Sequence, residues 1–377
     1  MRKKTICILR SNPVNPDSRV EKEARALENN GYNVIIFCWD RDSNHAVQKE
    51  FLSNSNIVIF RAGFKASYGE GMKNIVPYLK FQFCMKKWLL HNKRYYDAVH
   101  ACDFDTANFT INTVLKLKKI FVFDIFDFIF GKPKNRFQTI IKKRELKLIN
   151  RSNATIICTE DRKKQIQGST PKKLVVIHNT PPYIKDEACL LPTAIDCINV
   201  VYVGVLTDNR LLSEELEVFK RHPKWNFYIG GFGLHEKEFL EASRMYKNIH
   251  FLGKLTYEET LRLESKADIL LAIYDPEIEN HKFAAPNKFY ESLMLGKPLL
   301  MVKGTGLSKN LEKYNFGYLI DYSEESFEKG VEVLISRRQE WGEMSKKMKD
   351  IYKTQYNWDI MESRLIELYA DLFSLRS

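Results

Sequence analysis

A basic and an acidic side chain, Lys288 and Glu291, stand three residues apart in segment 284–298, which reads AAPNKFYESLMLGKP. Pro286 suits the first turn of a helix, so both side chains are predicted on one helix face. The positive end of the helix dipole favours a phosphate beside Lys288. The Glu291 carboxylate can accept hydrogen bonds from the two hydroxyls of a ribose. An ordinary surface ion pair is the alternative.

Three more loops follow predicted strands in the second half of the chain. Gly204 begins the first loop, and Arg210 is expected to enter the next helix, where its guanidinium can bind a phosphate with two hydrogen bonds. The second loop is the glycine-rich run 230–233. Its Gly231 and Gly233 are predicted to offer backbone N–H groups to an anion, with a purely structural turn as the alternative.

The third loop, residues 253–257, is expected to hold a nucleobase. The backbone of this loop can pair with the base and the ring of Tyr257 can cover it, although a plain turn is the alternative. Together with the Lys288 helix, these loops predict a site for a nucleoside diphosphate. Its expected residues are Gly204, Arg210, Gly231, Gly233, Lys254, Leu255, Tyr257, Asn287, Lys288 and Glu291.

Alternating strands and helices must position these loops. Short apolar runs alternate with helical patterns, which is typical of βαβ units and parallel sheets. The runs predict strands at 5–10, 33–39, 57–61, 98–101, 120–124, 154–158 and 174–177, then at 198–203, 225–229, 249–252, 268–274, 299–302 and 317–320. We therefore expect an α/β fold with two doubly wound Rossmann-like domains, which face a cleft lined by the carboxyl ends of their strands.

Length and turn residues predict the domain boundaries. At 377 residues the chain exceeds one ordinary core, so two domains are expected, at 1–182 and at 196–355. The connection at about 180–197 has turn residues and no clear period. A last helix, 358–377, is predicted to pack back on the first domain.

The composition predicts an ordered, cytoplasmic protein. Hydrophobic residues make up 44% of the chain, which excludes a disordered protein. No run of about 18 uncharged apolar residues is present. The seven cysteines are widely spaced and odd in number, so we expect reduced thiols and no zinc site. No metal-ligand pattern is visible, so a metal-independent reaction without a cofactor is expected.

Positive charge is concentrated in the first half of the chain. The net charge is +12, and residues 1–190 hold 34 Lys and Arg against 18 Asp and Glu, whereas the remainder holds 25 against 29. This favours a polyanionic partner over a merely soluble basic surface. Segment 75–93 mixes aromatic residues with lysines at helical spacing, so it is predicted to lie on an anionic membrane surface or to turn its aromatic rings into the core. Nucleic acid is disfavoured because no recognised binding module is present.

Polar residues also follow strands of the first half. Asn12 and Arg19 are candidates to bind an acceptor or a phosphate, whereas the alternative gives Asp17 a helix-capping role. His100 is a candidate to contact the transferred sugar, and Asp127 to orient an acceptor hydroxyl. Structural roles are the alternative for both.

Several motifs carry a family resemblance that covers nearly the whole chain. In the second half they are NIHFLG at 248–253, ADILLA at 267–272, and the segment from PNK at 286–288 to GKP at 296–298. In the first half they are the pair Asn12-Pro13, DSRV at 17–20 and KEA at 22–24, which lead to Gly31. With these motifs the sequence resembles glycosyltransferase family 4, the group 1 glycosyltransferases of GT-B fold, and in particular enzymes of polysaccharide biosynthesis.

The resemblance implies an acceptor-binding domain at 1–182, a nucleotide-sugar-binding domain at 196–355, and a retaining reaction in which cations stabilise the leaving diphosphate. Arg210 matches the first phosphate-binding cation of the family, but Glu215 stands where the second is usual, so Lys288 is preferred over Lys254 for that role. Glu291 matches the second of two family glutamates, and the first falls on Phe283.

These inferences predict a glycosyltransferase of hexosyltransferase type that moves a sugar from a nucleotide-diphosphate donor to a hydroxyl of a glycan acceptor. The acceptor is expected to be lipid-linked, at the inner face of the cell membrane, in surface polysaccharide biosynthesis. The alternatives are a sugar-nucleotide epimerase of the same fold and a non-enzymatic protein that binds nucleotide or anionic lipid. The catalytic candidates are Arg210, Lys288, Glu291, His100 and Asp127.

Overall fold

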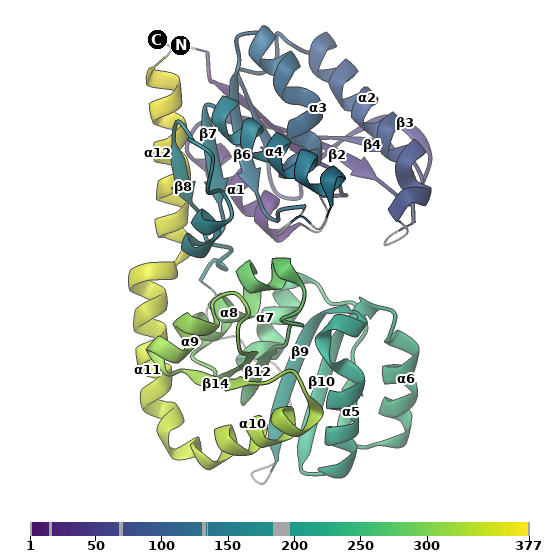
Figure 1. Cartoon of the computed structure of the whole chain (residues 1–377), viewed down its shortest axis with the longest axis vertical. Coiled ribbons are helices and arrows are strands. Elements are labelled where there is room, and N and C mark those ends of the chain that lie inside the picture. The colour runs from purple at the N-terminus through teal and green to yellow at the C-terminus, as the bar shows by residue number, and fades with distance from the viewer. Residues whose placement is uncertain are drawn as a thin grey trace. The chain divides into compact units, whose positions relative to one another are not determined.

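The computed structural model describes residues 2–14, 17–67, 71–129, 133, 135–183 and 197–375. The chain forms two compact units: Met1–His178 with Met361–Ser377 make unit 1, and Asn179–Ile360 make unit 2. Each unit is an α/β sheet with helices on both faces (Figure 1). The prediction of two doubly wound Rossmann-like sheets is therefore confirmed. Of the predicted connection at 180–197, residues 184–196 lie outside the described residues.

The sheet of unit 1 has eight strands in the order β3-β4-β2-β1-β5-β6-β7-β8. All neighbours are parallel except β3, which runs antiparallel to β4. The strands are β1 (Thr5–Arg10), β2 (Asn33–Asp40), β3 (His45–Phe51), β4 (Val58–Gly63), β5 (Ala98–Cys102), β6 (Ile120–Ile125), β7 (Ala154–Ile157) and β8 (Leu174–Val176). The helices are α1 (Ser18–Asn29), α2 (Ile75–His91), α3 (Asp103–Lys116), α4 (Arg136–Arg151) and the main part of α12 (Trp358–Ser374).

The sheet of unit 2 has six parallel strands in the order β11-β10-β9-β12-β13-β14. The strands are β9 (Ile198–Leu206), β10 (Trp225–Gly233), β11 (Ile249–Phe251), β12 (Ile269–Ala272), β13 (Leu299–Val302) and β14 (Gly317–Ile320). The helices are α5 (Leu212–Arg221), α6 (Glu236–Met245), α7 (Tyr257–Ser265), α8 (Asn287–Leu295), α9 (Ser308–Tyr314), α10 (Glu324–Ser336) and α11 (Trp341–Ile351).

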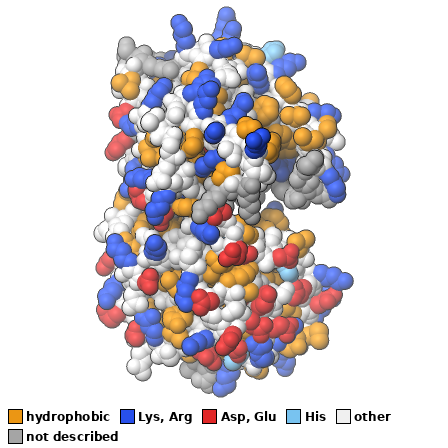
Figure 2. All heavy atoms as spheres, viewed as in Figure 1, with side chains coloured by type: hydrophobic (Ala, Val, Ile, Leu, Met, Phe, Trp, Pro, Cys, Tyr) orange, Lys and Arg blue, Asp and Glu red, His pale blue; other side chains and the backbone are white. Residues whose placement is uncertain are grey.

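The charge imbalance of the sequence is visible on the surface. Figure 2 shows Lys and Arg side chains spread over unit 1, whereas the Asp and Glu side chains gather mainly on unit 2. Among the described residues, no helix combines the length and the apolar character that crossing a bilayer requires.

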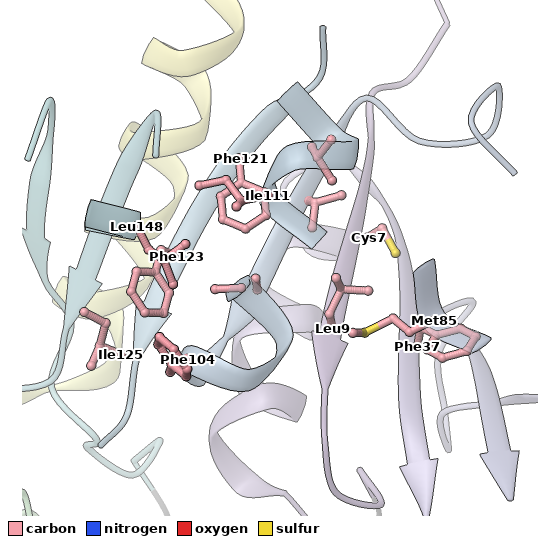
Figure 3. Packing of buried hydrophobic residues seen from close by; sticks show 14 of the residues in the cluster. Cys7, Leu9, Phe37, Met85, Phe104, Ile111, Phe121, Phe123, Ile125 and Leu148 are labelled. Atoms are coloured by element: carbon pink, nitrogen blue, oxygen red, sulfur yellow. The ribbon is translucent and has the colours of Figure 1, made fainter. Parts of the chain in front are cut away.

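One face of the unit 1 sheet packs against α2, α3 and α4. Residues Leu9 and Phe123 of the sheet contribute to a buried cluster with Met85 of α2, Ile111 of α3 and Leu148 of α4 (Figure 3). Side chains alternate between the two faces of a strand, so the residues next to these point to the opposite face. That face is covered by α1 and α12, as the stacking of an α12 ring on a β5 side chain shows.

Candidate functional site

The carboxyl ends of β9 and β12 form the topological switch point of unit 2. Strands β10 and β11 lie on one side of this pair, and β13 and β14 lie on the other. Ligands of open α/β sheets bind in the crevice at such a point. Arg210 follows β9 at the end of a short 3-10 turn, and the loop from β12 to α8 holds Tyr274 and His281.

Arg210 is held in one orientation at this switch point. Its guanidinium lies over the ring of Tyr274, 4.0 Å from the ring centre. Its Nη1 donates to the backbone oxygen of Asn209 at 3.0 Å and to Nε2 of His281 at 3.3 Å. His281 accepts at Nε2 because its Nδ1 donates to the backbone oxygen of Asp275 at 2.8 Å. Neither Nε nor Nη2 of Arg210 hydrogen-bonds a described residue, so this partly exposed side chain keeps donors for an anion.

Lys288 and Glu291 form an internal ion pair rather than the surface pair that was the alternative. Lys288 Nζ lies 2.8 Å from Glu291 Oε2 and 2.7 Å from Oε1 of Glu264 in α7. Both carboxylates are 0% exposed and Lys288 is 8% exposed. The helix begins after Pro286, at φ −61°, and ends at Gly296, which adopts φ +68°. Sequence spacing found the first pair and missed Glu264.

The burial of Glu291 limits its predicted role. Its Oε1 has no hydrogen-bond partner among the described residues, so it keeps acceptor capacity, but no part of the carboxylate is on the surface. Contact with a ribose therefore requires a local movement around α8. Asn287, at the start of the same helix, accepts a hydrogen bond from Asn179.

The glycines predicted to bind an anion serve strand packing. Gly204 and the run 230–233 lie inside β9 and β10, because both strands extend beyond their predicted ends. Gly231 has φ +145°, and a Cβ there would lie 1.9 Å from the Gly204 oxygen. Its N–H donates to the Gly253 oxygen at 2.7 Å, and the N–H of Gly233 donates to a glutamate of α6 at 2.7 Å. Both N–H groups therefore have acceptors within unit 2.

The predicted base-binding loop turns mostly inward. Leu255 packs against Gly230, because a Cβ built on Gly230 would lie 2.7 Å from Cδ1 of Leu255. The Tyr257 ring packs against a buried cluster, and its hydroxyl is buried without a partner among the described residues, so the side chain does not cover an open surface. Lys254 is exposed, with its ammonium 5.5 Å from the ring centre of Phe232.

Glu215, at the position where the resemblance expects a second cation, lies in the core. The side chain is fully buried in α5, and neither carboxyl oxygen has a hydrogen-bond partner among the described residues. Burial raises the pKa of Glu215 well above its usual range, so the group is a neutral part of the core. This position therefore offers no contact to a phosphate.

Arg19 is a structural residue and not the phosphate contact that the sequence suggested. Its guanidinium is 5% exposed and its Nη2 donates to both oxygens of Asp124, at 3.0 and 3.2 Å. Its Nε lies 3.2 Å from the carboxylate of Glu23 in the same helix. The alternative for this segment is confirmed, because Asp17 caps α1 by accepting from the backbone N–H of Val20 at 3.3 Å.

His100 lies in the interior of unit 1 and does not reach the strand end. β5 continues to Cys102, so His100 points between the sheet and α12 and is 0% exposed. Its Nδ1 lies 2.9 Å from the Tyr369 hydroxyl and its Nε2 lies 3.2 Å from Asp124 Oδ2. His100, Cys102 and Asp124 lie close enough to share a metal ion, but the guanidinium of Arg19 already occupies the carboxylate, which disfavours a cation there.

The switch point of unit 1, between β1 and β5, carries an ion pair that sequence analysis missed. Arg10 lies over the ring of Phe126, 4.3 Å from its centre, and pairs with Asp103 at the start of α3. Asn12 follows β1, and its Oδ1 is buried without a partner among the described residues. Asp127 follows β6 and is exposed, with one oxygen 2.6 Å from Arg162.

These two sheets and their switch points define a GT-B fold, and similar solved structures include a synthase, a UDP-bound protein and a glycosyltransferase. Sucrose-phosphate synthase from Thermosynechococcus elongatus matches with TM-score 0.77 and 13% identity, over 99% of this chain and 100% of that one. HepE of Anabaena in complex with UDP matches with TM-score 0.70 and 12% identity, over 98% and 100%. WaaG, a glycosyltransferase involved in lipopolysaccharide biosynthesis, matches with TM-score 0.65 and 13% identity, over 96% and 98%. The sequence matches no family model and no curated protein.

Proposed function

We propose that the protein is a retaining glycosyltransferase of family 4 that transfers a sugar from a nucleoside diphosphate donor to a hydroxyl of a glycan acceptor. The observation that carries the proposal is Arg210, a guanidinium with open Nε and Nη2 donors at the switch point of unit 2. These two groups form a planar fork that fits two oxygens of a phosphate. HepE, one of the similar solved structures, is in complex with UDP, which supports a uridine nucleotide as the first donor to test.

Arg210 would act by stabilising charge on the leaving diphosphate. In the reaction, the bond from the anomeric carbon to the diphosphate oxygen breaks, and the acceptor oxygen bonds to that carbon on the same face. The proton of the acceptor hydroxyl passes to the leaving phosphate, so no protein nucleophile is needed. Donors that are fixed before the charge develops lower the barrier most. Lys288 is the second cation of the proposal, and Asp127 orients the acceptor hydroxyl.

The proposal predicts which ligands stabilise the protein against heat. A ligand at about 100 times its Kd adds about 2.7 kcal/mol to the free energy of unfolding, so the right nucleotide should raise Tm by a few degrees. UDP, GDP, ADP and their sugar conjugates should be compared in a thermal-shift assay, with and without EDTA. We expect nucleotides of one base to raise Tm more than the others do. The rise should be the same with and without EDTA, because Arg210 and Lys288 supply the positive charge that a metal ion would otherwise supply.

Two results would separate the proposal from its alternatives. A shift by nucleotide without any hydrolysis of nucleotide sugar, with or without acceptor, would favour a binding protein. A shift and a turnover that both vanish in EDTA and return with Mg²⁺ would contradict the metal-independent mechanism. No shift by any nucleotide would contradict the whole proposal.

We further propose that a face of unit 1 rests on an anionic membrane at the cytoplasmic side, where a lipid-linked acceptor for surface polysaccharide is reached. α2 turns Phe81, Met85 and Leu89 into the core, as the alternative for this helix expected. Its opposite side nevertheless leaves apolar side chains exposed on the helix that carries the exposed Lys80 and Lys87. These are Ile75, Val76, Leu79, Phe83 and Leu90, which are between 37% and 62% exposed.

α4 covers the same side of the sheet as α2 and also exposes apolar and basic side chains. Phe137 and Ile140 are 66% and 62% exposed on α4, beside four basic residues. The basic residues are Arg136, Lys143, Arg144 and Lys147, all exposed. α2 contains no acidic residue, and Glu145 of α4 is buried, so neither helix exposes a carboxylate. Exposed apolar side chains among lysines are typical of helices that lie on anionic lipid.

Changing Lys80, Lys86 and Lys87 to Glu should weaken binding to anionic vesicles about 100-fold, since each basic residue near the surface contributes about 1 kcal/mol. Co-sedimentation with vesicles of anionic or neutral lipid measures this. Wild-type binding should require anionic lipid and be lost at high salt, because the Debye length shrinks from about 10 Å at 0.1 M to about 3 Å at 1 M. A matched control changes Lys237, Lys309 and Lys347 of unit 2 to Glu. Wild-type protein that stays in the supernatant at low salt, or equal losses in both triple variants, would contradict the membrane proposal.

A further inference from the structure

Glu264 of α7 joins the Lys288–Glu291 pair in an internal cluster of three charged groups. Lys288 Nζ lies 2.7 Å from Glu264 Oε1 and 2.8 Å from Glu291 Oε2. Lys288 is the only cation that contacts either carboxylate within the part of the chain that the structure describes. One ammonium therefore faces two carboxyl groups, and both carboxyl groups are 0% exposed.

Such a cluster is one proton short of neutrality when both carboxyl groups are ionised. A buried charge without a counter-ion is unfavourable, so the group takes up a proton instead. Burial and the neighbouring Glu291 carboxylate raise the pKa of Glu264 to about 8, although Lys288 opposes this. At neutral pH one proton therefore resides mainly on Glu264, and the cluster holds one positive and one negative charge.

We propose that Glu264 is a positioning residue that acts as a protonated carboxyl and holds Lys288 and Glu291 together in the arrangement from which the local movement around α8 presents them to the nucleotide. This inference rests on the proposed function of those two residues. Oε1 of Glu264 lies 2.7 Å from the ammonium of Lys288, and the hydroxyl of the protonated group is a donor that the unpaired Oε1 of Glu291 can accept. The arrangement fixes the ammonium between two oxygens and keeps a single carboxylate charge beside it.

The groups that surround Glu264 determine what its ionisation would do. Lys288 and Glu291 face Glu264 from α8. Tyr257 on α7 is close enough to interact electrostatically with Glu264, Glu291 and Tyr352. None of these adds a positive charge when Glu264 loses its proton. The second carboxylate would then repel Glu291 and compete for Lys288, so the nucleotide site would lose its geometry. If only the protonated form binds nucleotide, the apparent Kd rises about tenfold for each pH unit above 8.

The test compares wild type with Glu264→Gln, because glutamine keeps the shape and a donor but cannot ionise. Calorimetric titration with UDP between pH 6 and 9.5 should show the rise in Kd above pH 8 for wild type and a flat profile for Glu264→Gln. Glu264→Leu keeps the bulk without the polar contacts and should bind UDP about tenfold more weakly even at pH 7.

Stability against pH gives a second measurement that needs no nucleotide. The pKa of Glu264 is higher in the folded protein than in the unfolded chain, so its contribution to stability is complete below about pH 4.5 and is lost as pH rises to about 8. The free energy of unfolding should therefore fall more steeply over this range in wild type than in Glu264→Gln. Glu145→Gln is the matched control, since burial also raises the pKa of that unit 1 residue to about 8. It should flatten the stability profile and leave the UDP profile unchanged.

The possible outcomes separate this inference from the proposed function. A wild type that binds no nucleotide at pH 7 contradicts the proposed function, and the inference falls with it. UDP binding with the same pH profile in wild type and Glu264→Gln overturns the inference alone. Identical stability profiles for those two proteins also overturn it, because the proton would then not reside on Glu264.

Discussion

Replacing Arg210 with alanine should lower the turnover number about 100-fold while changing the Kd of the donor only a few-fold. The open Nε and Nη2 groups lie where the diphosphate is expected, and charge on that group grows as the sugar bond breaks. A lost donor that faces developing charge typically costs about 2.7 kcal/mol or more in the barrier. Steady-state kinetics of UDP release measure the turnover, and calorimetry measures the binding.

Arg210→Lys distinguishes charge from geometry. Lysine restores a positive charge but not the planar fork, so it should recover only part of the lost turnover. Arg262→Ala is the control, since that arginine is exposed on α7 and pairs with Glu258 on the surface. An unchanged turnover number in Arg210→Ala would remove this residue from the mechanism. Lys288→Ala is a poorer test of the second cation, because it leaves two buried carboxyl groups without a counter-ion.

The strands were predictable because nearly all of them are buried on both faces. Parallel strands between two layers of helices read as continuous apolar runs, as in Ala154–Ile157, where every residue is buried. The missed strand, β3 at His45–Phe51, is an edge strand that is mostly exposed and runs antiparallel to its neighbour. Its polar sequence resembles a loop, so hydrophobic periodicity does not detect it.

The site was predictable only where its partners are close in sequence. Lys288 and Glu291 are one helical turn apart, and that spacing alone places them together. Glu264 comes from another helix, so only the packing of α7 against α8 reveals that it shares Lys288. The open donors of Arg210 depend on a ring and a histidine in the loop after β12, and no spacing rule connects them.

Strand length explains the remaining errors. β9 and β10 run further than their apolar cores, so glycines that follow an apolar run were assigned to loops. The position of His100 was misjudged in a similar way. β5 continues to Cys102, so His100 lies inside the strand, and its side chain contacts α12 instead of lying at the edge of the sheet.

Replacing Glu291 with glutamine should weaken UDP binding about 10- to 100-fold and leave the fold intact. An amide accepts hydrogen bonds at one oxygen only and carries no charge, and a hydrogen bond to a charged group contributes about 1.5–3 kcal/mol. The fold should persist because Lys288 keeps Glu264 as a partner, 2.7 Å away. With the Glu291 charge removed, Glu264 should ionise in its place, and the cluster stays neutral.

Calorimetry with UDP and thermal unfolding of the same sample measure both parts of this expectation. The control is Glu343→Gln, because Glu343 and Lys346 form an ion pair with the same spacing of three residues on the surface of α11. That variant should match wild type in affinity and in Tm, since exposed pairs contribute little. An affinity of Glu291→Gln within twofold of wild type would show that the ribose hydroxyls meet another acceptor. The buried Glu291 carboxylate would then serve only to hold Lys288 in place.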